Sequence, residues 1–426
     1  SFRENRKWII ENYWKCLIKY IEKLGIVIFT HHKIKKWKLQ NKEQQWKIPL
    51  YKIFTDDEDI KLITNIVKRG NNWALGPEIE ELEKKLANYV GVDYCLTLNS
   101  GTSALHASLL SSGVGNSDEI LVPSFSFIST ANAALFVNSK PVFVDIEEET
   151  FGMNPELIEQ NISNKTKAII PMDYGGQSCK IFEIKEKSDK NNLILIEDAA
   201  ESLGSKIKGS KVGSVSDIAI FSFCGNKVLT TGEGGAIVTN SKEKFEKIKL
   251  IRSHGRIDEG NYFSNPNIAN YYDIGYNWRM SSLTASLGIS QLDKLEKIIS
   301  MRQKNAEYIS TRISKWNQIR TPKSTNENEN IFQMYTIRLK NKNIRDELQK
   351  FLLEKRIFSK IYFTPIHLSK FYMNKVGTKK GDLPVTEKVS DQVLTLPLYP
   401  NMEKEEMNYI VDSVNRFFEN YNLTGL

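Results

Sequence analysis

Residues 221–235 read FSFCGNKVLTTGEGG, and this stretch decides both the fold and the chemistry expected of the chain. An apolar, strand-like segment from Asp217 to Phe223 leads into a loop of small residues that carries one lysine, Lys227. A lysine that forms a Schiff base needs such a setting: a fixed backbone, room for a flat cofactor and partial removal of water. Taken alone, a surface lysine in a glycine-rich turn explains the stretch better, so the assignment depends on other motifs.

The first supporting motif is the apolar run LILI at residues 193–196, which is followed by Glu197 and Asp198. A continuous apolar run of this length predicts a buried parallel strand. Proteins of the α/β class bind ligands at the carboxyl ends of such strands, which is where Asp198 lies. A carboxylate there can keep a pyridine nitrogen protonated, which makes pyridoxal phosphate an electron sink. A helix N-cap aspartate is the alternative.

The second supporting motif is NSGTSAL at residues 99–105, where a short strand runs into a helix. Backbone N–H groups and hydroxyls at a helix start bind phosphate, although an ordinary capped helix explains this motif equally well. The three motifs follow one another as phosphate loop, aspartate and lysine. The residues between Asp198 and Lys227 suffice for one βα crossover, so neighbouring strands can present both side chains to one ring.

Together, these motifs resemble the DegT/DnrJ/EryC1/StrS family of pyridoxal-phosphate-dependent sugar aminotransferases. The resemblance runs from about Ile48 to the C-terminus and rests on EDAAESLGS at residues 197–205, FSFCGNK at 221–227 and TTGEGG at 230–235. Within the family, the chain is most similar to the perosamine-synthase branch, which makes 4-amino-4,6-dideoxy sugars on nucleotides.

The resemblance implies roles for individual residues at the cofactor. Lys227 matches the lysine that carries pyridoxal phosphate, and Asp198 matches its partner at the pyridine nitrogen. Five further residues complete the set. Gly101 and Thr102 match the phosphate loop, and Ser222 matches a serine at a strand end. Phe127 matches an aromatic residue that stacks on the ring, and Glu201 an acidic residue close to the cofactor. Ring stacking needs a flat apolar face, which Phe127 supplies, and core packing is the alternative for it.

Further positions concern the subunit interface and the substrate. Asn277 matches an asparagine that the partner subunit lends to the phosphate, which implies a homodimer with shared active sites. Arg256 and Arg279 are candidate contacts to the diphosphate of a nucleotide sugar, because a guanidinium binds phosphate oxygens in pairs; surface salt bridges are the alternative. His367 is a candidate contact to the sugar, with a loop histidine surrounded by solvent as the alternative. No metal site is expected.

The lysine at position 227 also bears on the reaction. Some family members carry histidine at this position and are dehydratases. The presence of lysine in this chain therefore implies transamination. The expected reaction moves an amino group from glutamate to the C4 ketone of a nucleotide-linked 4-keto-6-deoxy sugar. A 3-amino transferase, or an enzyme acting on a UDP- or dTDP-sugar, stays open because no motif specifies the base or the ketone position. A non-catalytic regulatory protein is a further alternative, against which the intact Lys227 and Asp198 argue.

Length and composition agree with a cytoplasmic enzyme. A chain of 426 residues exceeds what one core usually holds, so we expect a large cofactor-binding domain over residues 48–290 and a smaller C-terminal α/β domain over 291–426. Four scattered cysteines without metal-ligand spacing fit a reducing compartment. No run of about 20 apolar residues is present that would span a membrane.

Strand-like and helix-like patterns alternate along the chain, which predicts an α/β fold with a mostly parallel sheet covered on both faces. In the family this is fold type I. A long helical stretch is expected from Leu283 to Ile313. Strands are expected at residues 119–122, 141–146, 168–172, 193–196, 218–223 and 236–239.

Residues 1–47 form an extension that lies outside the resemblance. The first 50 residues hold 12 Lys and Arg against 4 Asp and Glu, whereas the rest of the chain holds 47 of each. Four of the seven tryptophans also fall in this opening stretch. Two interpretations stay open. The extension is either an arm that binds an anionic partner, or upstream sequence that was included because the translation start was assigned wrongly. Nucleic-acid binding is not expected of the enzyme.

Overall fold

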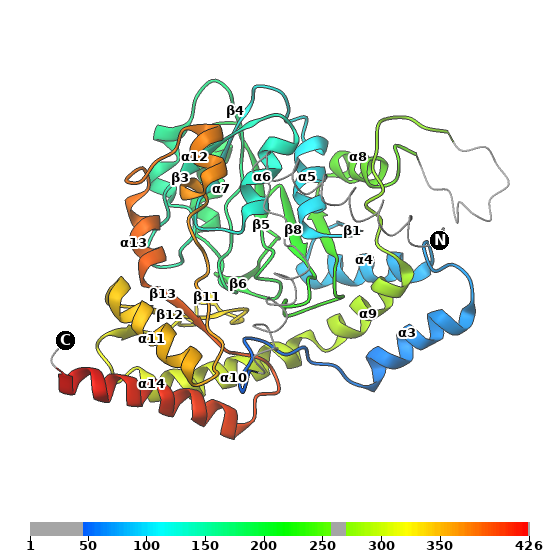
Figure 1. Ribbon diagram of the computed structural model, residues 1–426. Coiled ribbons are helices and arrows are strands. Elements are labelled where there is room, and N and C mark those ends of the chain that lie inside the picture. The colour runs from blue at the N-terminus through cyan, green and yellow to red at the C-terminus, as the bar shows by residue number, and fades with distance from the viewer. Residues whose placement is uncertain (1–45, 257–269, 425–426) are drawn as a thin grey trace, which may run out of the picture. The chain divides into compact units, whose positions relative to one another are not determined.

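The structure is a computed structural model that describes residues 46–256 and 270–424, so the predictions for the N-terminal extension lie outside the described residues. Ile48–Leu426 forms one compact unit. Within it, helices pack on both faces of a central sheet, and a smaller helix-covered sheet follows toward the C-terminus (Figure 1).

The central sheet has seven strands in the order β1-β9-β8-β5-β4-β2-β3. Neighbouring strands from β8 to β3 are parallel, whereas β9 is antiparallel to both β8 and β1. The mostly parallel sheet expected from the sequence is therefore confirmed. Strand β9 is the exception because the chain returns from β8 through a loop, without a crossover helix. The strands are β1 Tyr94–Leu98, β2 Glu119–Pro123, β3 Lys140–Val144, β4 Thr166–Ile169, β5 Ile194–Asp198, β8 Ile218–Ser222 and β9 Gly235–Thr239.

Alternate residues of the central strands enter different cores, which explains why these strands read as continuous apolar runs. Ile220 and Ile237 pack with one set of helices, and their chain neighbours Phe221 and Val238 pack with another. The first set is α5 Gly101–Ser111, α6 Ile128–Phe136 and α8 Lys242–Arg252. The second is α4 Pro77–Val90, α9 Ser282–Asp293 and the start of α10 Leu295–Ile313. Helix α7 Ile181–Lys190 packs against β4 and β5, and α3 Asp57–Arg69 against α9.

A second, antiparallel sheet has the order β10-β12-β13 and is covered by α10, α11 and α14. A third, small sheet has the order β11-β6-β7 and joins residues 206–211 to residues 328–329. The remaining described strands and α-helices are β6 Lys206–Ile207, β7 Ser210–Lys211, β10 Ile319–Arg320, β11 Asn328–Glu329, β12 Tyr335–Leu339, α11 Lys342–Glu354, α12 Lys370–Val376, α13 Pro384–Gln392, β13 Val393–Leu396 and α14 Lys404–Thr424. Short 3-10 helices lie at Pro155–Leu157, Glu159–Asn161 and Ile366–Leu368.

The long helix expected from Leu283 to Ile313 is wrong in one respect, because it is two helices separated by Lys294. The ammonium of Lys294 binds the carboxylates of Asp56 and Asp59, at 2.9 Å from the latter. These contacts come from the start of α3, so the local apolar pattern did not reveal the break. The expected domain boundary at residues 290/291 falls inside α9, and the division into two domains stays a prediction.

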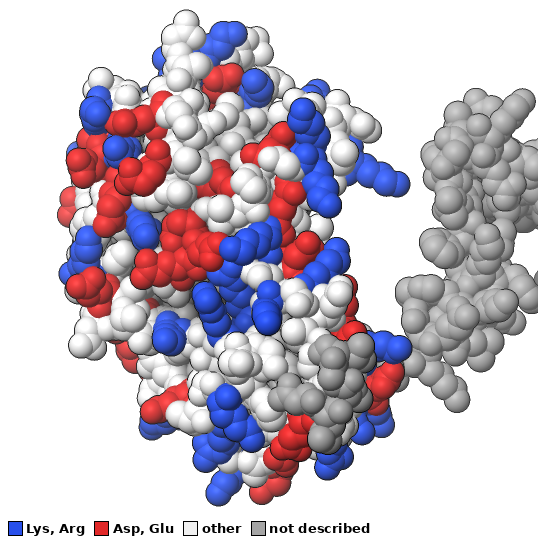
Figure 2. All heavy atoms as spheres, turned by 90° about the vertical axis from the view of Figure 1, so that its left-hand side faces the viewer, with Lys and Arg blue, Asp and Glu red and all other residues white. Residues whose placement is uncertain are grey.

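Charged side chains of both signs mix on the face that lies to the left in Figure 1. Figure 2 shows acidic and basic groups side by side near the middle of this face. Such mixing agrees with the equal numbers of acidic and basic residues after residue 50. Over the described ranges, no helix is long and apolar enough to cross a membrane.

Candidate active site

Two neighbouring parallel strands carry the central residues of the site. Asp198 ends β5 and lies opposite Ile220 of β8, two residues before Ser222 at the end of that strand. The loop after β8 folds back on itself, since Phe223 N donates to Gly234 O (2.9 Å) and Thr231 N donates to Phe223 O (2.9 Å). This loop holds Lys227, whose side chain is only 13 % exposed. The structure thus brings the lysine and the aspartate to one edge of the sheet.

Asp198 is buried and lacks a full counter-charge. Its Oδ2 accepts a hydrogen bond from Thr130 Oγ1 (2.7 Å), and its Oδ1 accepts one from Ala200 N (3.3 Å). Burial raises the pKa of this carboxyl from 3.8 to about 6, although both hydrogen bonds and the nearby Lys227 charge act in the opposite direction. A cation bound against Asp198 would lower the cost of keeping it ionised. The aspartate is therefore suited to a protonated ring nitrogen.

Glu201 connects the lysine to the adjacent loop. Its Oε1 lies 3.4 Å from Lys227 Nζ, and its Oε2 accepts a hydrogen bond from Gly175 N (3.0 Å). The carboxylate is buried, so this ion pair is partly shielded from water. Glu201 therefore holds the reactive nitrogen of Lys227 in place.

The start of α5 forms an anion cradle beside Ser222. Ser100 caps this helix by accepting a hydrogen bond from Ser103 N (3.1 Å), while the N–H groups of Gly101 and Thr102 have no acceptor within the helix. A Cβ on Gly101 would lie 3.0 Å from the Cβ of Ser222, so glycine allows the helix start to meet the end of β8. These donors and the helix dipole favour a phosphate here.

Gly235 also shapes this cradle, and the sequence analysis missed it. A Cβ at Gly235 would lie 2.6 Å from the carbonyl carbon of Ser100, which is closer than real Cβ contacts come. Glycine at the start of β9 therefore lets the phosphate loop sit on the sheet. The signal was the Gly-Gly pair at residues 234–235, which the sequence offers only as the end of the TTGEGG motif.

Phe127 is the N-cap residue of α6, and the residue is 57 % exposed. That exposure rules out core packing, which was the alternative for this residue. Thr130, one helical turn later, donates to Asp198 and shares a short hydrogen bond with Ser126 Oγ (2.6 Å). The start of α6 thus presents a flat apolar ring close to the buried aspartate. The role of Thr130 was also missed, because nothing in the local pattern connects it to a residue 68 positions away.

The candidates Asn277, Arg279 and Arg256 lie in or beside a segment that borders the phosphate loop. Asn277 is exposed, and its backbone bridges to Ser253. The backbone of Arg279 bridges to Leu98 at the end of β1, and its guanidinium donates to Ser253 Oγ (3.1 Å). Arg256 is 5 % exposed. The proposed phosphate and diphosphate contacts of these residues stay predictions.

The position of His367 agrees neither with a sugar contact nor with a loop histidine surrounded by solvent. Its ring is fully buried, with Nδ1 2.7 Å from Ser124 Oγ and Nε2 3.1 Å from Glu387 Oε1. The short helix Ile366–Leu368 packs against the end of β2, since Ile366 N donates to Ser124 O (3.0 Å). Both ring nitrogens are occupied inside the protein, so this arrangement gives His367 a packing role and no contact to a sugar.

The described part of the chain holds no group of three or more His, Cys, Asp or Glu residues that could bind a metal ion. The site therefore consists of a lysine–glutamate pair, a buried aspartate, an exposed aromatic ring and an anion cradle. These groups can bind a flat, cationic ring with a phosphate arm and move protons beside it.

Comparison with known proteins gives consistent matches. The DegT/DnrJ/EryC1/StrS aminotransferase family matches residues 54–415. GDP-perosamine synthase of Escherichia coli O157:H7 is 34 % identical over 374 residues, covering 87 % of this chain and 98 % of that protein. UDP-2-acetamido-2-deoxy-3-oxo-D-glucuronate aminotransferase of Pseudomonas aeruginosa is also 34 % identical, covering 81 % and 92 %. The PLP form of the putative sugar aminotransferase Spr1654 from Streptococcus pneumoniae superimposes with a TM-score of 0.82 at 26 % identity, covering 88 % and 99 %.

Proposed function

This chain belongs to the DegT/DnrJ/EryC1/StrS aminotransferase family and is a pyridoxal-phosphate-dependent transaminase; from that premise, we propose that it transfers an amino group from glutamate to the C4 ketone of a nucleotide-linked 4-keto-6-deoxy sugar. The observation that supports this proposal best is the placement of Lys227 and Asp198 at one sheet edge, near enough for the Lys227 charge to oppose the rise that burial causes in the pKa of Asp198, in a chain 34 % identical to a GDP-perosamine synthase. Such a product is an amino sugar for a surface polysaccharide or glycan.

The residues present fit pyridoxal phosphate. Asp198 would bind the ring nitrogen, Phe127 would stack on the ring, and Lys227 would carry the cofactor covalently. The phosphate would lie at the start of α5 against Gly101, Thr102 and Ser222, where a Cβ on Gly101 would fill the cradle. When bound, the cofactor supplies an electron sink that stabilises negative charge on the carbon bonded to the amine.

The protein's own groups then carry the protons. Lys227 Nζ takes the proton from Cα of glutamate and, in the second half of the reaction, returns a proton to C4 of the sugar. Glu201 keeps Nζ oriented between these steps. Asp198 keeps the ring nitrogen protonated, since its carboxylate is buried and gains from a cationic partner.

The other parts of the proposal concern assembly and location. Asn277 is exposed on the segment beside the phosphate loop, which is compatible with a homodimer in which it reaches the partner's phosphate. Arg256 and Arg279 are proposed diphosphate contacts. A cytoplasmic location is proposed because nucleotide sugars and glutamate occur there.

A second candidate is amination at C3, or of a UDP- or dTDP-sugar. It is favoured by the UDP-3-oxo-sugar aminotransferase of Pseudomonas aeruginosa, which is as similar to this chain as the perosamine synthase is. The identities to these relatives therefore do not show whether the ketone at C3 or at C4 is aminated.

The test is to incubate the purified protein and glutamate with 4-keto-6-deoxy sugars linked to GDP, UDP and dTDP, and with a UDP-3-keto sugar. Mass spectrometry detects the amine, NMR locates it, and the Lys227→Ala protein is the control. We expect preferential formation of a 4-amino product from the GDP-sugar. If glutamate changes the absorbance of the bound cofactor but only the 3-keto sugar is aminated, the second candidate holds. If glutamate causes no change and no sugar reacts, the transaminase assignment fails.

A further inference from the structure

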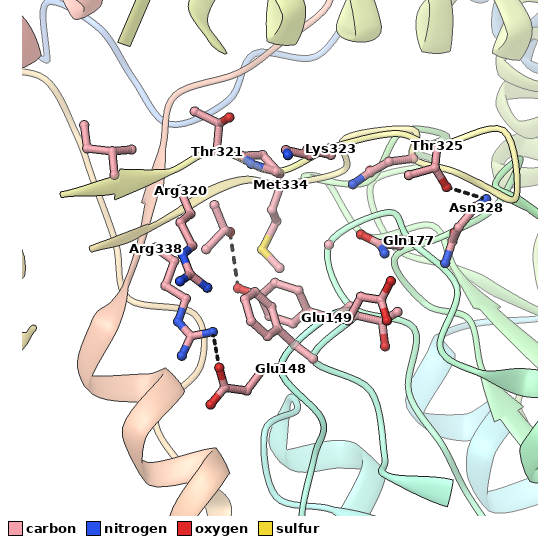
Figure 3. A pocket seen from close by; sticks show the side chains of 18 of the residues that line it. Glu148, Glu149, Gln177, Arg320, Thr321, Lys323, Thr325, Asn328, Met334 and Arg338 are labelled. Atoms are coloured by element: carbon pink, nitrogen blue, oxygen red, sulfur yellow. Dashed lines mark hydrogen bonds and ion pairs between the residues drawn. The ribbon is translucent and has the colours of Figure 1, made fainter. Parts of the chain in front are cut away.

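A cavity among the described residues is separate from the site of Lys227. It has a volume of about 620 Å³, which falls in the range typical of small-molecule sites. Its walls come from the loop after β3, the turn after β4, and the sheet that contains β10 and β12. None of the residues proposed to hold the cofactor lines it. Figure 3 shows this cavity from close by.

Two arginines enter the cavity from adjacent strands. Arg320 of β10 and Arg338 of β12 are direct cross-strand partners in an antiparallel pair. In Figure 3 their guanidinium groups lie side by side and point into the cavity. Like charges placed directly opposite each other destabilise a sheet. This pairing therefore needs negative charge close to both groups.

Only one of the two arginines is neutralised. Arg338 forms an ion pair with Glu148 (3.0 Å), and the same carboxylate also binds Lys388 (2.8 Å). The second carboxylate in the lining, Glu149, binds Lys180 (3.3 Å). Both acidic residues are thus already engaged by cations.

Arg320 and Lys323 supply the excess positive charge. Among the side chains that the structure describes, neither of these two has a hydrogen-bond or ion-pair partner, and both are exposed at the cavity. Thr321 and Thr325 add hydroxyls beside them. A guanidinium fork with an ammonium and hydroxyls is the donor set that binds phosphate oxygens.

The remaining wall is apolar and aromatic. Tyr174 and Met334 are buried with an edge exposed to the cavity, and Phe151 packs on Tyr174 with ring centroids 5.3 Å apart. The Met334 thioether points into the cavity in Figure 3. Flat rings and polarisable sulfur favour an aromatic ligand. Asn328, also in the lining, is held by a hydrogen bond from its side-chain amide to Ser178 O (2.9 Å).

We propose that this cavity binds a nucleotide, with its phosphate on Arg320 and Lys323 and its base against Phe151, Tyr174 and Met334. The proposal does not depend on which sugar the enzyme aminates. The site is also close to the catalytic lysine, because Gly175 lines the cavity while its N–H binds Glu201 on the other side. An occupant would therefore contact the turn that positions the Glu201–Lys227 pair.

The test uses a reporter inside the cavity, since a nucleotide can also reach the substrate site. The full-length protein, loaded with cofactor and labelled at its methionine methyl groups, is titrated with GMP, AMP or inorganic phosphate and followed by NMR. Met334→Leu identifies the cavity signal, and Met280, which lies near Gly234 in the cofactor loop, is the control signal. We expect GMP or AMP to shift the Met334 signal with saturation and leave the Met280 signal less affected.

Charge variants provide the comparison. Arg320→Ala with Lys323→Ala should weaken nucleotide binding at Met334 by roughly tenfold or more, because hydrogen bonds to charged groups are lost. Arg320→Lys should fall between this variant and the native protein. Lys340→Ala with Lys350→Ala removes the same charge from exposed positions outside the cavity and should have no effect.

Three outcomes would overturn the proposal. These are a Met334 signal that does not respond to millimolar nucleotide, equal affinity in the Arg320/Lys323 double variant, and phosphate binding as tightly as GMP and AMP. The last outcome would leave an anion site without a role for the aromatic wall. Because Arg320 and Lys323 are exposed, melting curves should show that all variants fold, and the amination assay tests the proposed function separately.

Discussion

Replacing Asp198 by Asn should stabilise the cofactor-free protein at neutral pH while it removes catalysis. The buried carboxylate accepts hydrogen bonds from Thr130 Oγ1 and Ala200 N. An asparagine can keep both contacts. Its Oδ1 accepts from Ala200 N and its amide donates to Thr130 Oγ1, whose own proton can turn to Ser126 Oγ at 2.6 Å. The substitution therefore removes a buried charge without leaving a polar group unpaired.

The magnitude follows from the pKa of Asp198, which burial raises from 3.8 to about 6. The folded carboxyl holds its proton more tightly than the unfolded one, so the free energy of unfolding falls as pH rises from about 4 to about 6 and then levels off. A difference of about two pKa units corresponds to about 3 kcal/mol at pH 8. Roughly 2 kcal/mol of this change falls between pH 4.5 and pH 8.

Urea unfolding of both cofactor-free proteins, at one protein concentration from pH 4.5 to pH 8, measures this effect. Asp198→Asn should gain stability over the native protein by about 2 kcal/mol across that range. With cofactor, its turnover should drop by roughly 10²–10⁴-fold, in line with lost charge stabilisation. A stability difference that does not change with pH would refute the reasoning, because the carboxyl would then not be ionising at a cost. Near-normal turnover would show that Asp198 does not hold the ring nitrogen, since in the described chain no helix directly follows β5 for it to cap.

Three further predictions concern single positions. Lys227→Ala should retain the fold but neither bond covalently to the cofactor, as read from its absorbance, nor turn over; wild-type turnover would contradict the assignment. Mixing Lys227→Ala with the inactive Asn277→Asp protein should restore some activity if sites are shared, because one hybrid site receives both native residues; exchange of tagged subunits without recovered activity would show that Asn277 acts in its own chain. His367→Ala should lower the free energy of unfolding by about 1–3 kcal/mol, since it leaves buried partners unpaired, and should change KM little; a large rise in KM for the nucleotide sugar would restore its role as a sugar contact.

The elements that the sequence predicted correctly are those set by local pattern. The apolar runs before Asp198 and Lys227 are buried on both faces, and a parallel sheet is the structure that buries a strand in this way. Parallel neighbours end at the same edge, so the meeting of the two side chains followed from the pattern. The antiparallel direction of β9 did not follow from it, because a glycine-rich loop can lead in either direction.

The parts that were missed depend on contacts between distant segments. Thr130 matters because α6 starts beside the end of β5, and Gly235 matters because the phosphate loop lies on β9. His367 was expected either to contact the sugar or to lie in a loop surrounded by solvent, yet packing against Ser124 buries it completely. Local composition indicates a loop, but it does not show which surface the loop covers.

The distribution of charge in the site gives these separate contacts one physical explanation. Asp198 and Glu201 place two buried carboxylates next to a single ammonium, that of Lys227. The cofactor-free site therefore carries more negative than positive charge at the ring end, and burial raises the pKa of Asp198 there. The opposite end, at Gly101, has unpaired N–H groups and a helix N-terminus, which favour an anion. A ligand with a cationic ring and an anionic arm neutralises both ends at once, whereas the reversed orientation would place like charges together. The charges alone would thus orient the proposed cofactor, with its ring nitrogen at β5 and its phosphate at α5, before any contact to the sugar is made.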